Sequence, residues 1–129
     1  NYAMQSLGNE FTLIHSLDGY DEISLTSDTK IISNKGEFIM TPYQLGKRKV
    51  FPEELYGGNT VEAAAEIFKK IIQGKGSWSQ NAVVLANAAM ALQVTGQFEN
   101  YEAAFQAAVK SLESGAANNC LNQLISLQK

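Results

Sequence analysis

The sequence has little of several residue types that carry specific chemistry. Its 129 residues include one cysteine, one histidine, one tryptophan and two prolines. A single cysteine excludes an internal disulfide framework. One histidine and one distant cysteine provide too few soft ligands for a transition-metal site. Cys120 lies among apolar positions of a helical pattern, so we expect it to be a buried residue without a chemical role.

Positive charge and long apolar runs are also scarce. The formal net charge is −3 and residues 47–49 form the only basic cluster, so we expect no nucleic-acid partner. No stretch approaches the uninterrupted apolar length of a membrane span, and residues 1–7 lack the features of a signal peptide, so we expect no membrane association. With 45% hydrophobic residues, the chain can form a single domain with its own core.

The sequence does contain a compact acidic turn. All of its aspartates lie between positions 18 and 28, and Asp18, Asp21 and Glu22 fall close together around Gly19. Like charges this close repel unless a cation or solvent relieves them. A turn can bring neighbouring carboxylates to one side, and such a pair after a strand suits Mg²⁺. One interpretation is a Mg²⁺–phosphate site with Asp21 and Glu22 as ligands. The other is a solvated acidic turn in which Asp18 caps the bend.

Two further candidate sites are weaker. Residues 57–60 precede a predicted helix, and helix N-termini bind phosphate. No strand comes directly before them and no lysine follows at the Walker spacing, which favours a plain turn and cap. His15 lies beside Ser16 and Asp18, yet sequence neighbours rarely form a catalytic triad. We expect His15 to end a strand and to hydrogen-bond within the acidic turn.

The hydrophobic periodicity predicts an α/β chain in which strands come first and helices follow. Residues 34–36 place a glycine between two β-prone runs, which indicates a hairpin that Pro42 ends. Asn59 with Glu62 resembles a capping box, and Asn100 is expected to cap a later helix. The expected strands cover 11–15, 22–25, 29–33 and 37–41, followed by a long connection over 42–58. About four helices follow: one between positions 59 and 74, one over 80–95 that should be buried on most sides, one between 100 and 115, and one over 116–127.

The beginning of the chain has an unusual pattern. Residues 2–7 followed by Gly8 resemble the last turns of a helix that ends at a glycine. There is no initiator methionine and no cap before this segment. We therefore expect the 129 residues to be one domain, 1–129, that is the C-terminal fragment of a larger two-domain enzyme.

Three segments together resemble a known family. Residues 15–24, H-S-L-D-G-Y-D-E-I-S, are similar to the H-x-x-D-G-x-D-E-[IV]-S signature of the anthranilate phosphoribosyltransferase family. Residues 57–64 and 81–92 resemble two later segments of that family, the second being its V-L-L-N-A-A-A-A-L helix. The resemblance covers nearly the whole chain but only the C-terminal part of the family.

The resemblance implies both a fold and an activity. The fold would be the C-terminal part of the nucleoside phosphorylase/phosphoribosyltransferase α/β domain. The enzyme would transfer phosphoribosyl from phosphoribosyl pyrophosphate to anthranilate in tryptophan biosynthesis, releasing pyrophosphate. Family members are cytoplasmic, Mg²⁺-dependent and usually homodimeric. By motif, Asp21 and Glu22 would hold the Mg²⁺ that bridges to pyrophosphate.

One part of the family pattern is missing, and two alternatives stay open. The glycine-rich G-T-G-G-D loop of the family is absent from this sequence, so we expect these residues alone to be inactive. One alternative is a fragment of a related pyrimidine nucleoside phosphorylase, although such an enzyme has no pyrophosphate for a paired-carboxylate metal site to clamp. The other is a non-catalytic domain that binds a partner or dimerises through its alanine-rich helices.

Overall fold

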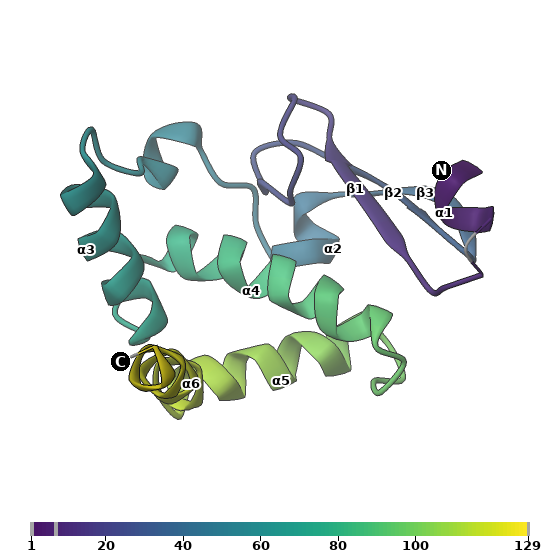
Figure 1. The fold of residues 1–129 in the computed structure, drawn as a ribbon. Helices are drawn as coiled ribbons and strands as arrows, with labels where there is room; N and C mark the ends of the chain where they lie inside the picture. The colour runs from purple at the N-terminus through teal and green to yellow at the C-terminus, as the bar shows by residue number, and fades with distance from the viewer. Residues whose placement is uncertain (1, 7, 129) are drawn as a thin grey trace.

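The computed structural model describes residues 2–6 and 8–128. The expected α/β architecture is confirmed: a small antiparallel sheet lies at one end, and helices fill the rest of the molecule (Figure 1). The strand order is β1-β2-β3. In chain order the elements are α1 (Tyr2–Ser6), β1 (Thr12–Ser16), β2 (Thr29–Ser33), β3 (Gly36–Met40), α2 (Pro42–Gly46), the 3-10 helix η1 (Pro52–Leu55), α3 (Val61–Ile72), α4 (Trp78–Val94), α5 (Tyr101–Glu113) and α6 (Ala116–Leu127).

The predicted hairpin is confirmed and helps to anchor the first strand. Ser33 lies opposite Gly36, so Asn34 and Lys35 form a two-residue turn. Gly36 has φ +122°, a backbone conformation that favours glycine. The Asn34 side chain accepts a hydrogen bond from the Phe11 N–H at 2.9 Å, which ties the turn to the approach to β1.

The short strand expected over 22–25 is absent. Those residues form bends and irregular structure. Leu25 is buried with φ +59°, in the left-handed region, which prevents a regular extended run. The backbone of Ile23 hydrogen-bonds to the side chain of Asn87. The segment is therefore held by tertiary contacts, which periodicity does not report.

The connection expected over 42–58 contains two short helices. Thr41 caps α2 in a reciprocal capping box with Gln44, and Pro42 takes the first helical position. Pro52 starts η1 in the same way. Proline at the first position costs no hydrogen bond, because the N–H there has no partner within the helix. The prolines that suggested a loop are thus helix starts.

The long helices lie where the sequence predicts them, with small shifts at their starts. Thr60, rather than Asn59, caps α3, because its hydroxyl accepts from the Ala63 N–H at 3.1 Å. Helix α4 begins at Trp78, two residues earlier than expected, behind a Ser77 cap. The Asn100 cap of α5 is confirmed. At the other end of the chain, α1 covers Tyr2–Ser6 and Gly8 has φ +68°, whereas Leu7 lies outside the described residues.

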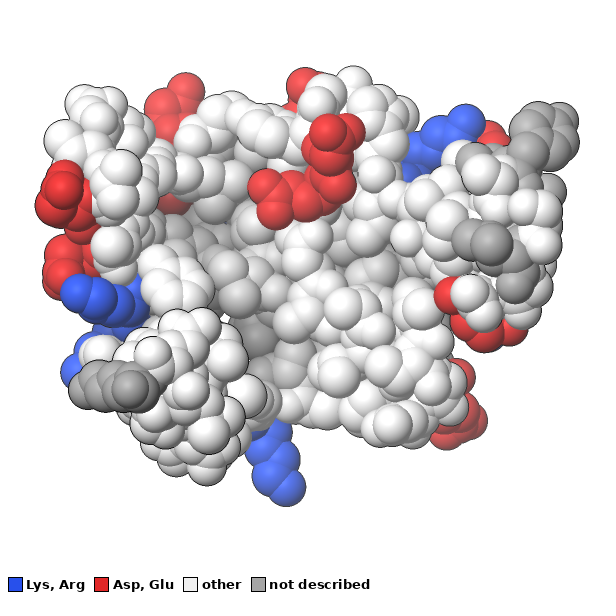
Figure 2. Space-filling view, viewed as in Figure 1, with Lys and Arg blue, Asp and Glu red and all other residues white. Residues whose placement is uncertain are grey.

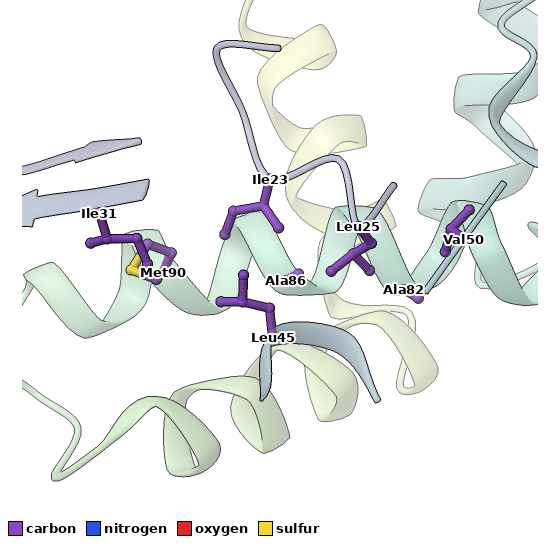
Figure 3. Close-up of a cluster of buried hydrophobic side chains, with 8 residues drawn as sticks. All are labelled: Ile23, Leu25, Ile31, Leu45, Val50, Ala82, Ala86 and Met90. Carbon is purple, nitrogen blue, oxygen red and sulfur yellow. The ribbon is translucent and has the colours of Figure 1, made fainter. Parts of the chain in front are cut away.

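Helix α4 carries the core. Its small side chains let the loop after β1, the sheet, α2 and the segment around Val50 pack against one side (Figure 3). A second cluster joins α4 to α5, which runs beside it (Figure 1). The expectation that α4 is buried on most sides is only partly met, since Val84 is 39% exposed. The eight buried residues of the main cluster are Ile23, Leu25, Ile31, Leu45, Val50, Ala82, Ala86 and Met90.

Cys120, which lies in helix α6, is exposed, so the expectation that it is buried is wrong. No described residue of α6 or α3 is buried. Helix α6 contacts α5 near their junction and then projects away from it (Figure 1). Its apolar positions therefore have no described neighbour that would bury them. None of the helices in residues 2–6 and 8–128 combines the length and apolar character that a bilayer span requires.

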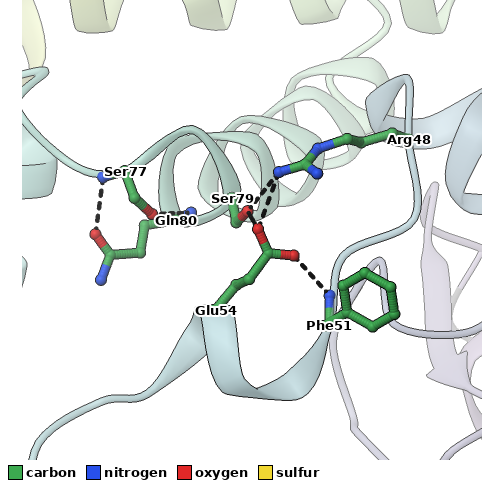
Figure 4. Close-up of polar contacts among 6 residues, drawn as sticks. All are labelled: Arg48, Phe51, Glu54, Ser77, Ser79 and Gln80. Atoms are coloured by element: carbon green, nitrogen blue, oxygen red, sulfur yellow. Dashed lines mark hydrogen bonds and ion pairs between the residues drawn. The ribbon is translucent and has the colours of Figure 1, made fainter.

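A polar cluster fastens η1 to the start of α4 (Figure 4). The Glu54 carboxylate accepts hydrogen bonds from the Ser79 hydroxyl at 2.7 Å, the Arg48 guanidinium at 2.9 Å and the Phe51 N–H at 2.9 Å. The guanidinium also lies over the Trp78 ring, 4.1 Å from its centroid. The Phe51 N–H, followed by Ser79 and Arg48, lowers the pKa of the Glu54 carboxyl.

We predict that Glu54→Gln destabilises the chain near neutral pH but not in acid. A carboxyl whose pKa is lowered by folding stabilises the folded state above its unfolded pKa of about 4.3, and this stabilisation is lost as pH falls through the folded value. Urea unfolding of wild type and variant across this range would reveal a difference that shrinks toward low pH. Glu53→Gln, on the same short helix, is the control. A pH-independent difference, or an equal effect of the control, would contradict the prediction.

The Tyr101 hydroxyl ties α5 to α2 and α4. It donates to the Leu45 carbonyl at 2.7 Å, with the Ala86 carbonyl 3.2 Å away. Burial raises the pKa of this hydroxyl. We predict that Tyr101→Phe lowers the free energy of unfolding by about 1 kcal/mol, because the two carbonyls lose a donor. Urea unfolding at neutral pH measures this, with the 69% exposed Tyr43 mutated to Phe as control. Equal stability of the two variants would contradict the prediction.

Candidate functional site

The acidic turn lies in the loop between β1 and β2, where acidic side chains project from the surface (Figure 2). Asp21 and Glu22 are adjacent and exposed. Within residues 2–6 and 8–128, neither carboxylate forms a hydrogen bond or an ion pair. Both are therefore available to a ligand from solvent.

Asp18 has a different environment from the other two acidic residues. Its carboxylate accepts hydrogen bonds from the Thr26 hydroxyl and, at 3.4 Å, from the Ser24 hydroxyl. Ser24 and Thr26 are buried. Asp18 thus closes the loop on itself, as the capping interpretation predicts, while Asp21 and Glu22 point outward. The hydrogen bonds of Asp18 fit the capping interpretation, and the metal-ligand interpretation of Asp21 and Glu22 stays a prediction.

Ser16, at the end of β1, supports the turn through hydrogen bonds. Its fully buried hydroxyl donates to the Glu22 carbonyl at 2.6 Å and accepts from the Ser24 N–H at 3.2 Å. The predicted turn at Gly19 is confirmed: Gly19 has φ +100°, and its N–H donates to the Ser16 carbonyl at 2.9 Å. Ser16 therefore contacts the acidic turn near its start, at Gly19, and at its end, at Glu22.

Helix α4 holds the same segment from the other side. The Asn87 side chain bonds both the N–H and the carbonyl of Ile23, the residue after Glu22. Farther along, the Leu25 carbonyl accepts from the Val50 N–H at 2.9 Å. An added Cβ at Gly46 would lie 2.4 Å from Leu25 Cδ1, so only glycine leaves room for the buried Leu25. The loop is anchored at several successive points.

The remaining sequence candidates contribute less. His15 lies in β1 opposite Lys30, one residue before the strand ends at Ser16. Its exposed side chain forms no hydrogen bond within the described part of the chain, so the expected hydrogen bond within the acidic turn is absent there. Successive strand residues face opposite sides, so the inward-facing Ser16 directs His15 outward. At residues 57–60, Gly58 turns the chain with φ +88° and Thr60 caps α3, which supports the plain turn and cap.

The donor set fits a hard, hydrated cation. Within the described residues, no three His, Cys, Asp or Glu side chains gather as metal ligands. Asp21 and Glu22 offer two neighbouring oxygen ligands on an exposed turn. Mg²⁺ binds through one or two protein carboxylates and fills its other positions with water and phosphate oxygens. The chemistry of the pair is therefore compatible with Mg²⁺.

The residues that support the turn were not identified from the sequence. In the sequence, Ser16 was considered only as a neighbour of His15. Asn87 was considered only as one residue of the helix motif at 81–92. A signal was nevertheless present, because Asn87 is an amide within the apolar run 82–92. A polar group in a buried position needs a hydrogen-bond partner, so such a residue predicts a specific contact.

Comparison with known proteins gives close sequence relatives. An anthranilate phosphoribosyltransferase from Christiangramia forsetii is 44% identical over 128 residues, which is 99% of this chain and 38% of that protein. One from Flavobacterium johnsoniae is 46% identical over 123 residues, covering 95% of this chain and 37% of the relative. The chain thus spans little more than a third of the length of these relatives.

Solved structures share the fold. Anthranilate phosphoribosyltransferase from Thermus thermophilus matches with a TM-score of 0.85 at 24% identity, over 96% of this chain and 37% of that one. The enzyme from Saccharomyces cerevisiae, solved in complex with PRPP and Mg, matches with a TM-score of 0.78 at 20% identity, over 91% of this chain and 33% of that one. The family model described as "Glycosyl transferase family, a/b domain" matches residues 2–118. This match covers most of the chain, which therefore belongs to the glycosyl transferase family with this a/b domain.

Proposed function

We propose that this chain is the metal-binding, C-terminal part of an anthranilate phosphoribosyltransferase. The observation that carries the proposal is the pair of exposed carboxylates of Asp21 and Glu22, which have no partner among the described residues and sit on a turn that buried contacts hold in place. Relatives of that name above 40% identity support it. The reaction is transfer of phosphoribosyl from phosphoribosyl pyrophosphate to anthranilate, with release of pyrophosphate.

In this proposal the chain supplies two oxygen ligands and leaves the other metal positions open. Asp21 and Glu22 hold Mg²⁺, which when bound neutralises the charge that develops on the departing pyrophosphate. Ser16 bonds the backbone at Tyr20 and Glu22, and Asn87 bonds the backbone of Ile23. Asp18 is kept out of the ligand set by its hydrogen bonds to buried hydroxyls. Phosphoribosyl pyrophosphate and anthranilate bind to the longer protein.

The two alternatives predict a different use of the turn. A nucleoside phosphorylase has no pyrophosphate to clamp, so paired metal-binding carboxylates would have no purpose there. A non-catalytic binding domain requires no outward-facing carboxylates at all. The outward-facing pair of carboxylates on a supported turn favours the transferase over both.

The apolar surface of the helices supports a larger assembly. Val61 and Phe68 of α3 are 80% and 51% exposed, and Leu127 of α6 is 84% exposed. Such surface is stabilised when other apolar side chains cover it. We propose that residues 1–129 form a single domain that is the C-terminal fragment of a larger two-domain, cytoplasmic and homodimeric enzyme, and that these faces pack against its remaining part.

We predict that Asp21→Asn with Glu22→Gln raises the Mg²⁺ concentration required by the full-length enzyme at least about tenfold, because neutral amides bind a hard cation weakly. The measurement is the initial rate across a Mg²⁺ titration. Asp28→Asn with Glu53→Gln removes the same charge elsewhere and serves as the control. An unchanged Mg²⁺ titration of the first variant, with its unfolding midpoint also unchanged, would contradict the metal site.

We also predict that the 129-residue chain alone catalyses no transfer, because the glycine-rich loop that holds pyrophosphate in the family is not in this sequence. Consumption of anthranilate, with phosphoribosyl pyrophosphate and Mg²⁺ present, should remain at the background rate. The full-length protein, at the same concentration, is the positive control. Turnover by the isolated chain that disappears in the Asp21→Asn, Glu22→Gln variant would overturn this prediction.

A further inference from the structure

Asn87 pairs with the backbone of Ile23 in the manner of a neighbouring β-strand. The Ile23 N–H donates to Asn87 Oδ1 at 2.9 Å, and Asn87 Nδ2 donates to the Ile23 carbonyl at 2.8 Å. The two residues are 64 positions apart in the sequence. Ile23 is fully buried, so its backbone groups have no easy exchange with water. The amide takes the place of the missing strand partner at this point.

A third hydrogen bond fixes the direction of the Asn87 amide. Nδ2 also donates to the Val83 carbonyl, one turn earlier on α4, at 2.9 Å. Flipping the amide by 180° would place its oxygen against the carbonyls of Ile23 and Val83, and two acceptors facing each other are unfavourable. Buried residues of the main cluster pack on helix α4, so Asn87 links the loop to the helix at the centre of the core.

We propose that Asn87 is a positioning residue for the metal ligands. Ile23 directly follows Glu22, and the Ser16 hydroxyl donates to the Glu22 carbonyl at 2.6 Å. The backbone at and directly after Glu22 is therefore hydrogen-bonded both to β1 and to α4. Residues that orient metal ligands in this way typically change metal affinity about 10- to 100-fold when they are removed. This inference rests on the proposed function, since it assigns Asn87 a role toward the Mg²⁺ held by Asp21 and Glu22.

A purely structural role would give a different result. Asn87→Leu leaves the Ile23 N–H and carbonyl without this partner and should lower stability. Lower stability alone leaves the affinity of the folded protein for Mg²⁺ unchanged. A positioning role loosens the loop and lowers that affinity, while binding of anthranilate is unaffected. The two roles are separated by comparing Mg²⁺ binding with stability.

The test uses the full-length protein with Asn87→Leu, which keeps the branch at Cγ and the number of side-chain heavy atoms but removes the hydrogen bonds. Calorimetric titration with Mg²⁺, in the presence of phosphoribosyl pyrophosphate and without anthranilate, should give an affinity about tenfold weaker than wild type. Hydrogen exchange at the Ile23 amide should become faster. The KM for anthranilate should be unchanged. Phe105→Leu, in the separate cluster between α4 and α5, is the control that lowers stability away from the loop.

Each outcome decides between the possibilities. Wild-type Mg²⁺ affinity in Asn87→Leu, or equal weakening in Phe105→Leu, would overturn the positioning role. If Asn87→Leu does not fold, Asn87→Asp retains the acceptor for the Ile23 N–H. Affinity weakened by this variant supports the role, and wild-type affinity overturns it. The Asp21→Asn, Glu22→Gln variant in the same titration separates the two proposals, because unchanged affinity there refutes the metal site itself.

Discussion

The structure depends on close packing against one alanine-rich helix. Ala86 and Ala89 of α4 are fully buried and face different clusters, one beneath the acidic loop and one beside α5. Small side chains let several elements approach the helix axis at once, and a larger side chain would push at least one of them away. Because α2, η1 and α5 all contact α4, its position determines theirs. The acidic loop therefore lies next to the core, because its residues Ile23 and Leu25 pack in the same cluster as α4.

This arrangement explains how a loop can hold three acidic side chains in a defined shape. Ile23 and Leu25 are buried and pull the loop onto α4, although Leu25 must adopt a left-handed conformation to do so. A bulky residue in that region costs of order 1 kcal/mol, which the burial of its side chain offsets. Asp18 is stabilised by hydroxyl groups, and the other two carboxylates remain in water. Their mutual repulsion is thus screened without a bound ion, and a cation can relieve it further.

Local signals in the sequence predicted most of the elements. The glycine that follows the two-residue turn located the hairpin, and Asn100 and Gly115 set the limits of α5. The motif at residues 15–24 identified the family and the acidic turn. Two of the errors have a common cause, which is that long-range contacts decided the outcome, whereas the caps at Thr41, Thr60 and Ser77 are local signals. The irregular course of residues 22–25 depends on hydrogen bonds to Asn87. Cys120 is exposed because no described element packs over its side of α6. Neither fact is encoded in the few residues on either side.

The contrast between a supported acidic turn and uncovered helices has a consequence for the proposed function. Two carboxylates with water form a weak Mg²⁺ site, because Mg²⁺ loses its hydration reluctantly and gains most from the phosphate oxygens that complete its coordination. If Asp21 and Glu22 hold Mg²⁺ as proposed, those oxygens would come from a substrate, and the glycine-rich loop that the family resemblance assigns to its binding is not in these 129 residues. Strong metal binding would then require the substrate and the rest of the proposed enzyme. The hydrogen bonds that hold the turn would assist it, because ligands that are already ordered lose less entropy when a metal–phosphate complex binds.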